Sequence, residues 1–140
     1  MQKKISAIHK TLIWDGEVSL SVLDTTALVN EAISRHHLSP VAAAALGRTL
    51  TASAYLCSWL KGEKSSLSVT VNGGGAGGKI CVAGDGDLHM RGFVQNPGVQ
   101  LPPRADGKLD VGGFVGKNGT LTVVRDDGQK RSFVGTSELI

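Results

Sequence analysis

One stretch of the chain, residues 39–62, combines a helix start, an almost unbroken apolar run and a helix stop. Ser39 is a preferred N-cap residue, and Pro40 follows at the first helical position, where its missing N–H costs no hydrogen bond. Lys61 and Gly62 are typical of a helix end. The pattern predicts a helix of about 30 Å, at roughly 1.5 Å per residue, that is almost wholly buried and around which the rest of the chain packs.

A narrow polar stripe runs along this predicted helix. Its members recur at helical spacing and are Arg48, Thr51, Tyr55 and Ser58. A membrane-spanning helix is disfavoured, because Arg48 at mid-helix would cost about 2.5–3.5 kcal/mol in a bilayer and the sequence has no second apolar span. The many alanines let other backbones come close, so we expect the helix to lie between two layers.

The composition narrows the class of protein. A chain of 140 residues, 41% of them hydrophobic and 19 of them glycine, suits one globular domain over residues 1–140 with many turns. Its net charge of +3 is too small to indicate a nucleic-acid partner. Cys57 and Cys81 are expected as free, buried thiols, which suit a reducing compartment, and the N-terminus lacks an apolar secretion signal. We therefore expect a cytoplasmic protein.

The segments before residue 39 predict a β-hairpin and a short helix. Apolar residues alternate from Ile5 onward and again after a turn at residues 15–16, and His9 is expected as a packed core histidine rather than a metal ligand. Residues 24–26 supply helix caps, and an apolar face then recurs at helical spacing as far as residues 36–37.

The segments after residue 62 predict strands. Apolar or alternating runs lie at residues 67–71, 79–83, 88–94, 110–115, 120–125 and 131–134, with 135–140 as the start of one more strand. The predicted fold class is α+β: an N-terminal β-hairpin, two helices including the long buried one, and a multi-stranded, mainly antiparallel sheet.

A glycine run from Gly73 to Lys79 matches the spacing of two nucleotide-binding patterns, G-x-G-x-x-G and G-x-x-x-x-G-K. Such sites need a helix N-terminus after the glycines and Ser or Thr after the lysine. Ile80 takes that position and a strand follows, so a flexible hairpin loop is favoured, with a phosphate-binding enzyme as the alternative. Asp85 and Asp87 fit a turn rather than a calcium loop. No motif surrounds a nucleophile, so we expect no enzyme and no catalytic residue.

Two longer stretches are much more specific than these patterns. The first is LSPVAAAALGRTLTASAYL at residues 38–56, ending in LKG at 60–62. The second is RGFVQNPGVQLP at 91–102, which runs on into GKLDVG at 107–112 and GTLTVVRD at 119–126, and the similarity extends to FVGTSEL at 133–139. Together they strongly resemble the HslO family, the redox-regulated 33 kDa chaperonin, a heat-shock holdase. The resemblance covers nearly the whole chain.

The resemblance implies an ATP-independent cytoplasmic chaperone that binds unfolding proteins under oxidative or heat stress. It also implies an N-terminal α+β domain that forms dimers by exchanging elements. Family members carry a C-terminal module in which four cysteines, in C-x-C and C-x-x-C arrangement, bind zinc and release it on oxidation. Cys57 and Cys81 lie in other segments, so we expect no metal and no cofactor in this chain and interpret it as the N-terminal core without the zinc module. Such a core either holds clients constitutively or is a structural, dimerising core inactive on its own.

A holdase needs accessible apolar surface, because burial of apolar area drives client binding. The candidate contacts are apolar residues near turns or loops, each of which also suits core packing: Trp14, Phe93, Val99, Leu101 and Phe114. The expected partners are unfolding proteins and a second copy of the chain, with no nucleic acid and no membrane. An RNA-binding module, suggested by a sequence pI of about 9.0 and the glycine loop, is a further alternative.

Overall fold

The predicted long helix begins where the sequence places it and ends earlier. In the computed structural model, which describes residues 6–129 and 131–139, α2 spans Pro40–Cys57. The Ser39 side chain caps it, with Oγ accepting the Ala42 N–H at 3.3 Å. After Cys57 the chain tightens into a turn in which the Leu60 N–H donates to the Cys57 carbonyl, so residues 58–62 do not continue the helix.

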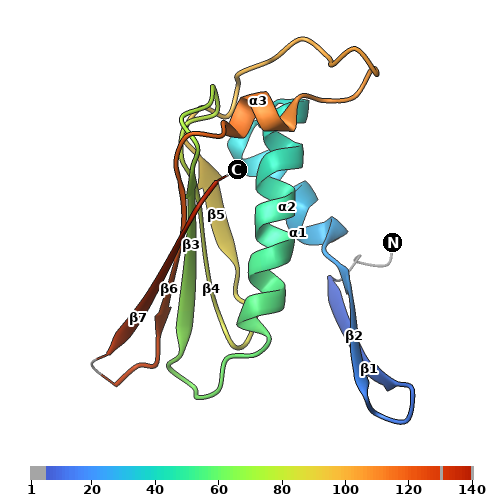
Figure 1. Ribbon diagram of the computed structural model, residues 1–140, viewed down its shortest axis with the longest axis vertical. Coiled ribbons are helices and arrows are strands. Elements are labelled where there is room, and N and C mark those ends of the chain that lie inside the picture. The colour runs from blue at the N-terminus through green and yellow to red at the C-terminus, as the bar shows by residue number, and fades with distance from the viewer. Residues whose placement is uncertain (1–5, 130, 140) are drawn as a thin grey trace.

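Five strands form an antiparallel sheet beside α2, in the order β5-β4-β3-β6-β7. Their bounds are β3 Ser66–Asn72, β4 Ile80–Asp85, β5 Arg91–Val94, β6 Thr120–Asp126 and β7 Ser132–Glu138. Figure 1 shows α2 standing along one face of this sheet. The predicted α+β class is confirmed, and within the described residues no helix has the length and hydropathy needed to cross a membrane.

The core lies between α2 and the inner face of the sheet. Its largest fully buried apolar side chains are Phe114, Leu46, Leu50, Ile80 and Val82. Because side chains alternate along a strand, Val82 and Ile80 of β4 point together toward α2. Each fully buried side chain of this size stabilises the fold by roughly 1.5–3 kcal/mol, so this layer fixes the helix on the sheet.

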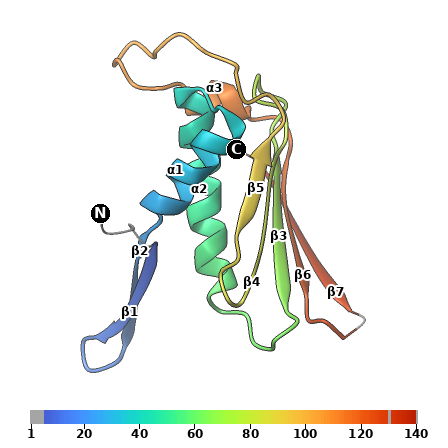
Figure 2. The ribbon, with the colours of Figure 1, turned by 180° about the vertical axis from the view of Figure 1, so that it is seen from behind.

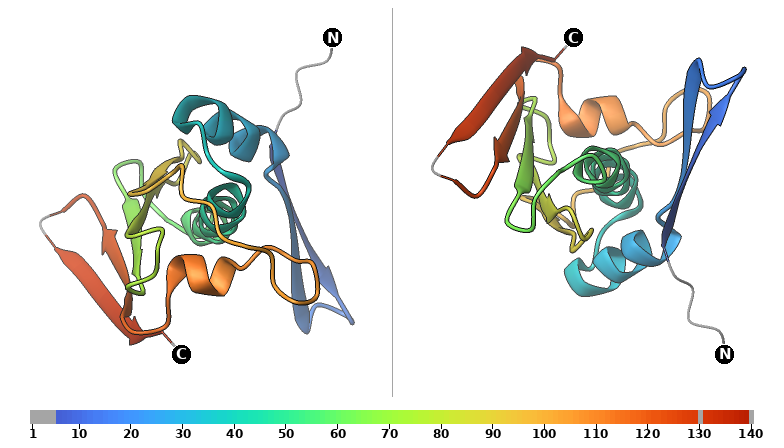
Figure 3. Two further views of the ribbon diagram at one scale, coloured as in Figure 1. Left: turned by 90° about the horizontal axis from the view of Figure 1, so that it is seen from above. Right: turned by 90° about the horizontal axis from the view of Figure 1, so that it is seen from below.

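Burial of α2 is confined to one side, so the prediction of an almost wholly buried helix is wrong. The side toward the sheet is buried, whereas Arg48, Ala52, Tyr55 and Leu56 are exposed. The two end-on views in Figure 3 place the sheet on one side of α2 and the β1-β2 hairpin on the other. The second layer therefore covers the helix only in part.

The elements before α2 are the predicted hairpin and short helix. β1 spans Ala7–Ile13, β2 spans Val18–Asp24 and α1 spans Thr26–His36. The hairpin is a separate two-stranded sheet that projects from the rest of the fold (Figure 1). His9 is exposed, so its prediction as a core histidine is wrong, because the alternation marks a strand without saying what covers it. Ile5 lies outside the described residues.

Two further sequence predictions are corrected. Residues 110–115 form no strand, because Val111–Val115 is a short helix, α3, whose first turn is capped by the Asp110 carboxylate accepting the Gly113 N–H at 2.9 Å. The last two predicted strands are one, β7, which pairs with β6 along its whole length. The opposite edge of the sheet, β5, lies beside α1, as the view from behind in Figure 2 shows.

Candidate functional site

Exposed apolar side chains gather on the β1-β2 hairpin. Leu12 is 65% exposed and Trp14 74%, and Leu20 and Val22 are also exposed. We call these four side chains the hairpin surface. The strand register puts Leu20 opposite Thr11 and Leu12 opposite Ser19, so Leu12 and Leu20 lie on opposite faces of the hairpin. Neither face of the hairpin is therefore fully covered by the rest of the fold.

Trp14 occupies an unusual backbone position at the hairpin turn. Its φ is 50°, in the left-handed region that Gly and Asn adopt far more readily than a bulky side chain does. The next two residues, Asp15 and Gly16, also have positive φ. A tryptophan in this position does not improve the turn, and its side chain packs against little of its own protein.

A few polar contacts hold the hairpin beside α2. The Lys10 Nζ donates to the Ser58 carbonyl at 3.0 Å and lies 4.1 Å from the centroid of the Trp59 ring. The hydroxyls of Thr25 and Thr51 lie 2.6 Å apart. These contacts fix the hairpin at the C-terminal end and the middle of α2 while burying little apolar area.

A groove of about 660 Å³ runs along α2 from Ala43 to Tyr55. On the hairpin and α1 side it is lined by Ser21, Leu23 and Val29, and on the helix side by Ala43, Ala44, Gly47, Arg48, Thr51, Ala52 and Tyr55. We call it the α2 groove. Three of the four residues of the predicted polar stripe line it, so the stripe faces this groove and not the sheet.

The five predicted contact residues divide into three groups. Trp14 and Phe93 are exposed, on the hairpin turn and on edge strand β5. Val99 and Leu101 are half-buried against the core, and the Val99 carbonyl accepts the Ser39 hydroxyl at 2.6 Å. Phe114 has no exposed surface, so in this fold it is a core residue that a client cannot reach.

Several apolar side chains are exposed that the sequence did not indicate as contact residues. Trp59 packs edge to face on Tyr55, with ring centroids 6.1 Å apart, and both are exposed at the end of α2. For the exposed end of α2, the polar stripe that includes Tyr55 was the sequence signal that could have indicated this surface. For Phe133 and Val134 on β7 no signal existed, because that strand is exposed on both faces despite its alternation.

The glycine run folds around a side chain and not around a phosphate. The N–H groups of Gly75 and Gly77 donate to the carbonyls of Val115 and Phe114 at 3.1 and 2.8 Å. A Cβ on Gly77 would collide with the Phe114 ring. The Gly78 N–H likewise donates to the Gly75 carbonyl, so these three backbone donors are already used, which counts against the phosphate-binding alternative.

The described residues do not fit a structural zinc site. Cys57 is buried on the α2 side of the sheet, whereas Cys81 is half-buried on a strand, and both are free. Asp85, Asp87 and His89 lie close together among the described residues, but this group is largely exposed and has no thiolate. Its geometry is that of a turn, in which the Asp85 carboxylate accepts the His89 N–H at 3.0 Å, and this hydrogen bond lowers the pKa of Asp85.

The buried thiol predicts an alkaline loss of stability. Burial, and secondarily the negative charge of Asp85, raises the pKa of the Cys57 thiol from 9.0 to about 11. Between these values the unfolded chain loses the thiol proton while the folded chain keeps it, so unfolding becomes easier by roughly 1.4 kcal/mol per pH unit. Urea midpoints measured across this range should fall less steeply in Cys57→Ala. Equal slopes in the two proteins would contradict the prediction.

The sequence is similar to those of known proteins. Residues 6–140 match the protein family described as Hsp33 protein. A 33 kDa chaperonin of Clostridium acetobutylicum is 45% identical over 121 residues, which cover 86% of this chain and 41% of the relative. A 33 kDa chaperonin of Alkaliphilus metalliredigens is 44% identical over 135 residues, which cover 96% and 46%.

A solved structure is also similar. The crystal structure of the 33 kDa chaperonin of Thermotoga maritima, a heat shock protein 33 homologue, superposes with a TM-score of 0.86 at 35% identity and covers 95% of this chain and 45% of that one. The chain thus spans less than half the length of the relatives it matches. These relatives are named as chaperonins, in agreement with the expectation that the chain is not an enzyme.

Proposed function

The chain belongs to the Hsp33 protein family, and we propose that it is the client-binding core of an ATP-independent holdase. It binds unfolding proteins through exposed apolar surface and keeps them from aggregating under heat or oxidative stress. The observation that carries the proposal is the hairpin surface, which presents Leu12 and Trp14 largely uncovered on a projecting element.

The physical basis of holding is burial of apolar area. An unfolding client exposes apolar segments, and covering one leucine or tryptophan side chain on each partner removes enough area to stabilise a complex by roughly 1.5–3 kcal/mol. No directed chemistry and no nucleotide are required. The left-handed backbone at Trp14 supports this role, because a residue kept at a cost to its turn is expected to serve binding.

The hairpin also suits this role mechanically. It forms its own two-stranded sheet, and Lys10 and Thr25 tie it to α2 by polar contacts. A client can therefore cover the hairpin without opening the core beneath α2. Holding by the folded core is what distinguishes this proposal from binding by a partly unfolded chain.

We place regulation outside this chain. The zinc and redox switch that the family resemblance implies are proposed to lie outside residues 1–140, and the described residues supply no set of four zinc ligands. The two free thiols suit a cytoplasmic, reducing compartment. Holding by this chain should then be independent of its redox state.

A structural, dimerising core is the second candidate function, and β7 favours it. β7 ends the five-stranded sheet, so its outer edge has no strand partner among the described residues. Its side chains are exposed, and Glu138 is its one charged residue. Such an edge invites pairing with a second strand, so sedimentation of the chain at increasing concentration should show a dimer if this function holds.

The proposed function predicts suppression of client aggregation. Guanidinium-unfolded luciferase diluted into buffer scatters light as it aggregates, and a molar excess of the chain should suppress the signal equally under reducing and peroxide conditions. An inert protein of similar size serves as the control. No suppression in either condition would leave the chain as a dimerising core, and suppression confined to peroxide would place a redox switch within residues 1–140.

A further inference from the structure

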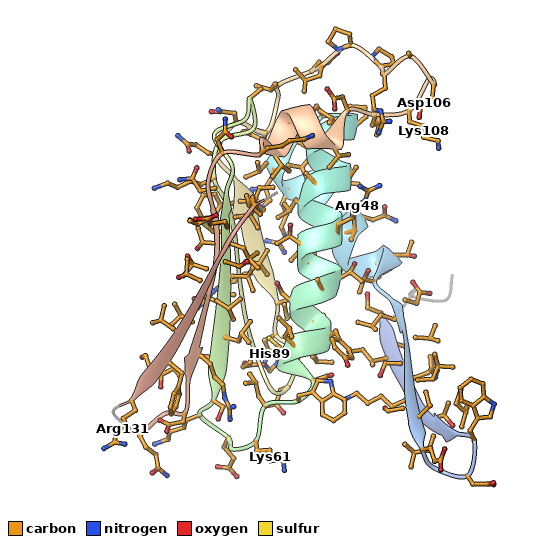
Figure 4. All side chains as sticks on the ribbon, in the orientation of Figure 1. Arg48, Lys61, His89, Asp106, Lys108 and Arg131 are labelled. Atoms are coloured by element: carbon orange, nitrogen blue, oxygen red, sulfur yellow. The ribbon has the colours of Figure 1, made fainter. Side chains whose placement is uncertain are left out.

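Arg48 is the charged residue of the α2 groove. The other groove residues are apolar or uncharged, among them Leu23, Ala44 and Ala52. Arg48 is exposed and makes no hydrogen bond or ion pair with any described residue. Figure 4 labels it beside α2 on the side away from the sheet. An unpaired guanidinium thus lines the otherwise uncharged α2 groove.

Two other arginines of the fold are paired with carboxylates. Arg35 pairs with Glu31 at 2.7 Å on α1, and Arg104 lies 3.6 Å from Asp106, so these arginines have carboxylate partners within the chain. Arg48 has no such partner among the described residues, and neither have Arg91 and Arg125, but of these three only Arg48 lines the α2 groove. A guanidinium presents donors in a fork that matches a carboxylate, so a carboxylate from outside the chain suits Arg48 chemically.

The size of the groove suits an extended segment. Ala44 and Tyr55 lie about 17 Å apart along α2, at roughly 1.5 Å per residue. Extended chain advances about 3.3 Å per residue, so about five residues of a client match this length. Arg48 stands between these two positions, where it faces the interior of such a segment rather than its ends.

We propose that the α2 groove binds an extended apolar client segment that carries one carboxylate, and that Arg48 pairs with this carboxylate. The inference rests on the proposed function and deepens it, because it names the class of client segment that the core selects. Charge complementarity identifies the client segment. The groove supplies one cation and apolar walls, so it favours a segment with Asp or Glu within an apolar run over one with Lys or Arg.

Labelled peptides test the proposal directly. Three fluorescein-labelled heptapeptides of Leu, Val and Ala, with a central Glu, Gln or Lys and soluble Gly-Ser flanks, are titrated with the full chain and followed by anisotropy. The Glu peptide should bind about three- to tenfold more tightly than the Gln peptide, and the Lys peptide most weakly. Added salt should shrink the difference between Glu and Gln.

Variants then assign the preference to Arg48. In Arg48→Gln the Glu and Gln peptides should bind equally, and in Arg48→Glu the order should reverse in favour of the Lys peptide. Reversal is a gain that an unfolded variant cannot mimic. Arg131→Gln is the matched control, because it removes the same charge at the far β6-β7 turn, as Figure 4 shows, and should keep the wild-type order.

Distinct outcomes overturn the inference and the proposed function. Equal binding of Glu and Gln peptides to wild type, or a preference kept in Arg48→Gln, overturns the groove assignment even if luciferase aggregation is still suppressed. Filling the groove with Ala52→Trp should abolish peptide binding. If that variant instead converts a dimer into a monomer while peptide binding persists, the occupant is a second copy and the inference fails. If the wild type fails to suppress luciferase aggregation, the proposed function itself is wrong.

Discussion

Replacement of Phe114 by alanine is expected to destabilise the fold by about 3–5 kcal/mol, the largest effect of any single change considered. The ring of Phe114, a residue of α3, is fully buried against α2 and the glycine run, and it belongs to the same cluster as Leu46 and Leu50. Truncation leaves a cavity that the surrounding helix and sheet cannot close. Urea unfolding of the wild type and Phe114→Ala, compared at equal m-values, measures the loss.

Coupling with Gly77 makes this prediction sharper. Gly77→Ala alone should cost roughly 1–3 kcal/mol, because its methyl group collides with the Phe114 ring. In the double variant the methyl group enters space that the ring has left. The double variant should therefore lose less unfolding free energy than the sum of the two single losses. Phe93→Ala, on the exposed edge strand, is the control and should cost little. If the two losses in unfolding free energy are simply additive, glycine at position 77 is not required by contact with the Phe114 ring.

Removing the apolar groups of the hairpin surface is expected to weaken client holding more than tenfold while leaving the fold intact. The variant combines Leu12→Thr, Trp14→Asn, Leu20→Thr and Val22→Thr. Threonine keeps the β propensity of the strands, and asparagine suits the left-handed backbone at the turn. Because each lost contact is worth roughly 1.5–3 kcal/mol, several together exceed a tenfold loss. The measurement is the chain concentration that halves luciferase scattering.

A matched variant separates the hairpin from the other exposed apolar surface. Phe133→Thr with Val134→Thr removes exposed apolar groups from β7 and should leave luciferase scattering suppressed. Circular dichroism and urea midpoints confirm that both variants fold. If the β7 variant loses holding and the hairpin variant keeps it, the client surface lies on the sheet edge and the assignment to the hairpin is wrong.

Local chemistry explains why several elements could be predicted from the sequence. The start of α2 depends on Ser39 and Pro40, whose effects extend over one turn, and the hairpin depends on alternation around a short turn. The stripe through Arg48 and Tyr55 is set by helical periodicity alone, and it is the one part of the candidate site that the sequence indicated beyond Trp14 and Phe93.

Burial, by contrast, depended on what the tertiary structure brings together. His9 and Val134 alternate as core residues do, yet no second layer covers them. Residues 111–115 have the composition of a strand but become α3, because Asp110 caps them and the glycine run receives Phe114. Periodicity specifies which residues share a face, and it carries no information on what packs against that face.

The sequence by itself therefore determined the family resemblance and most of the elements with their order, since these follow from spacing and residue identity along the chain. Only the tertiary structure decided that Phe114 is core, that α2 is covered on one side, and that Arg48 lines a groove. These outcomes depend on long-range contacts such as Lys10 with Trp59, in which residues far apart in the chain meet. A side chain is available to another protein only where such contacts leave it uncovered, and spacing along the sequence does not show where this happens.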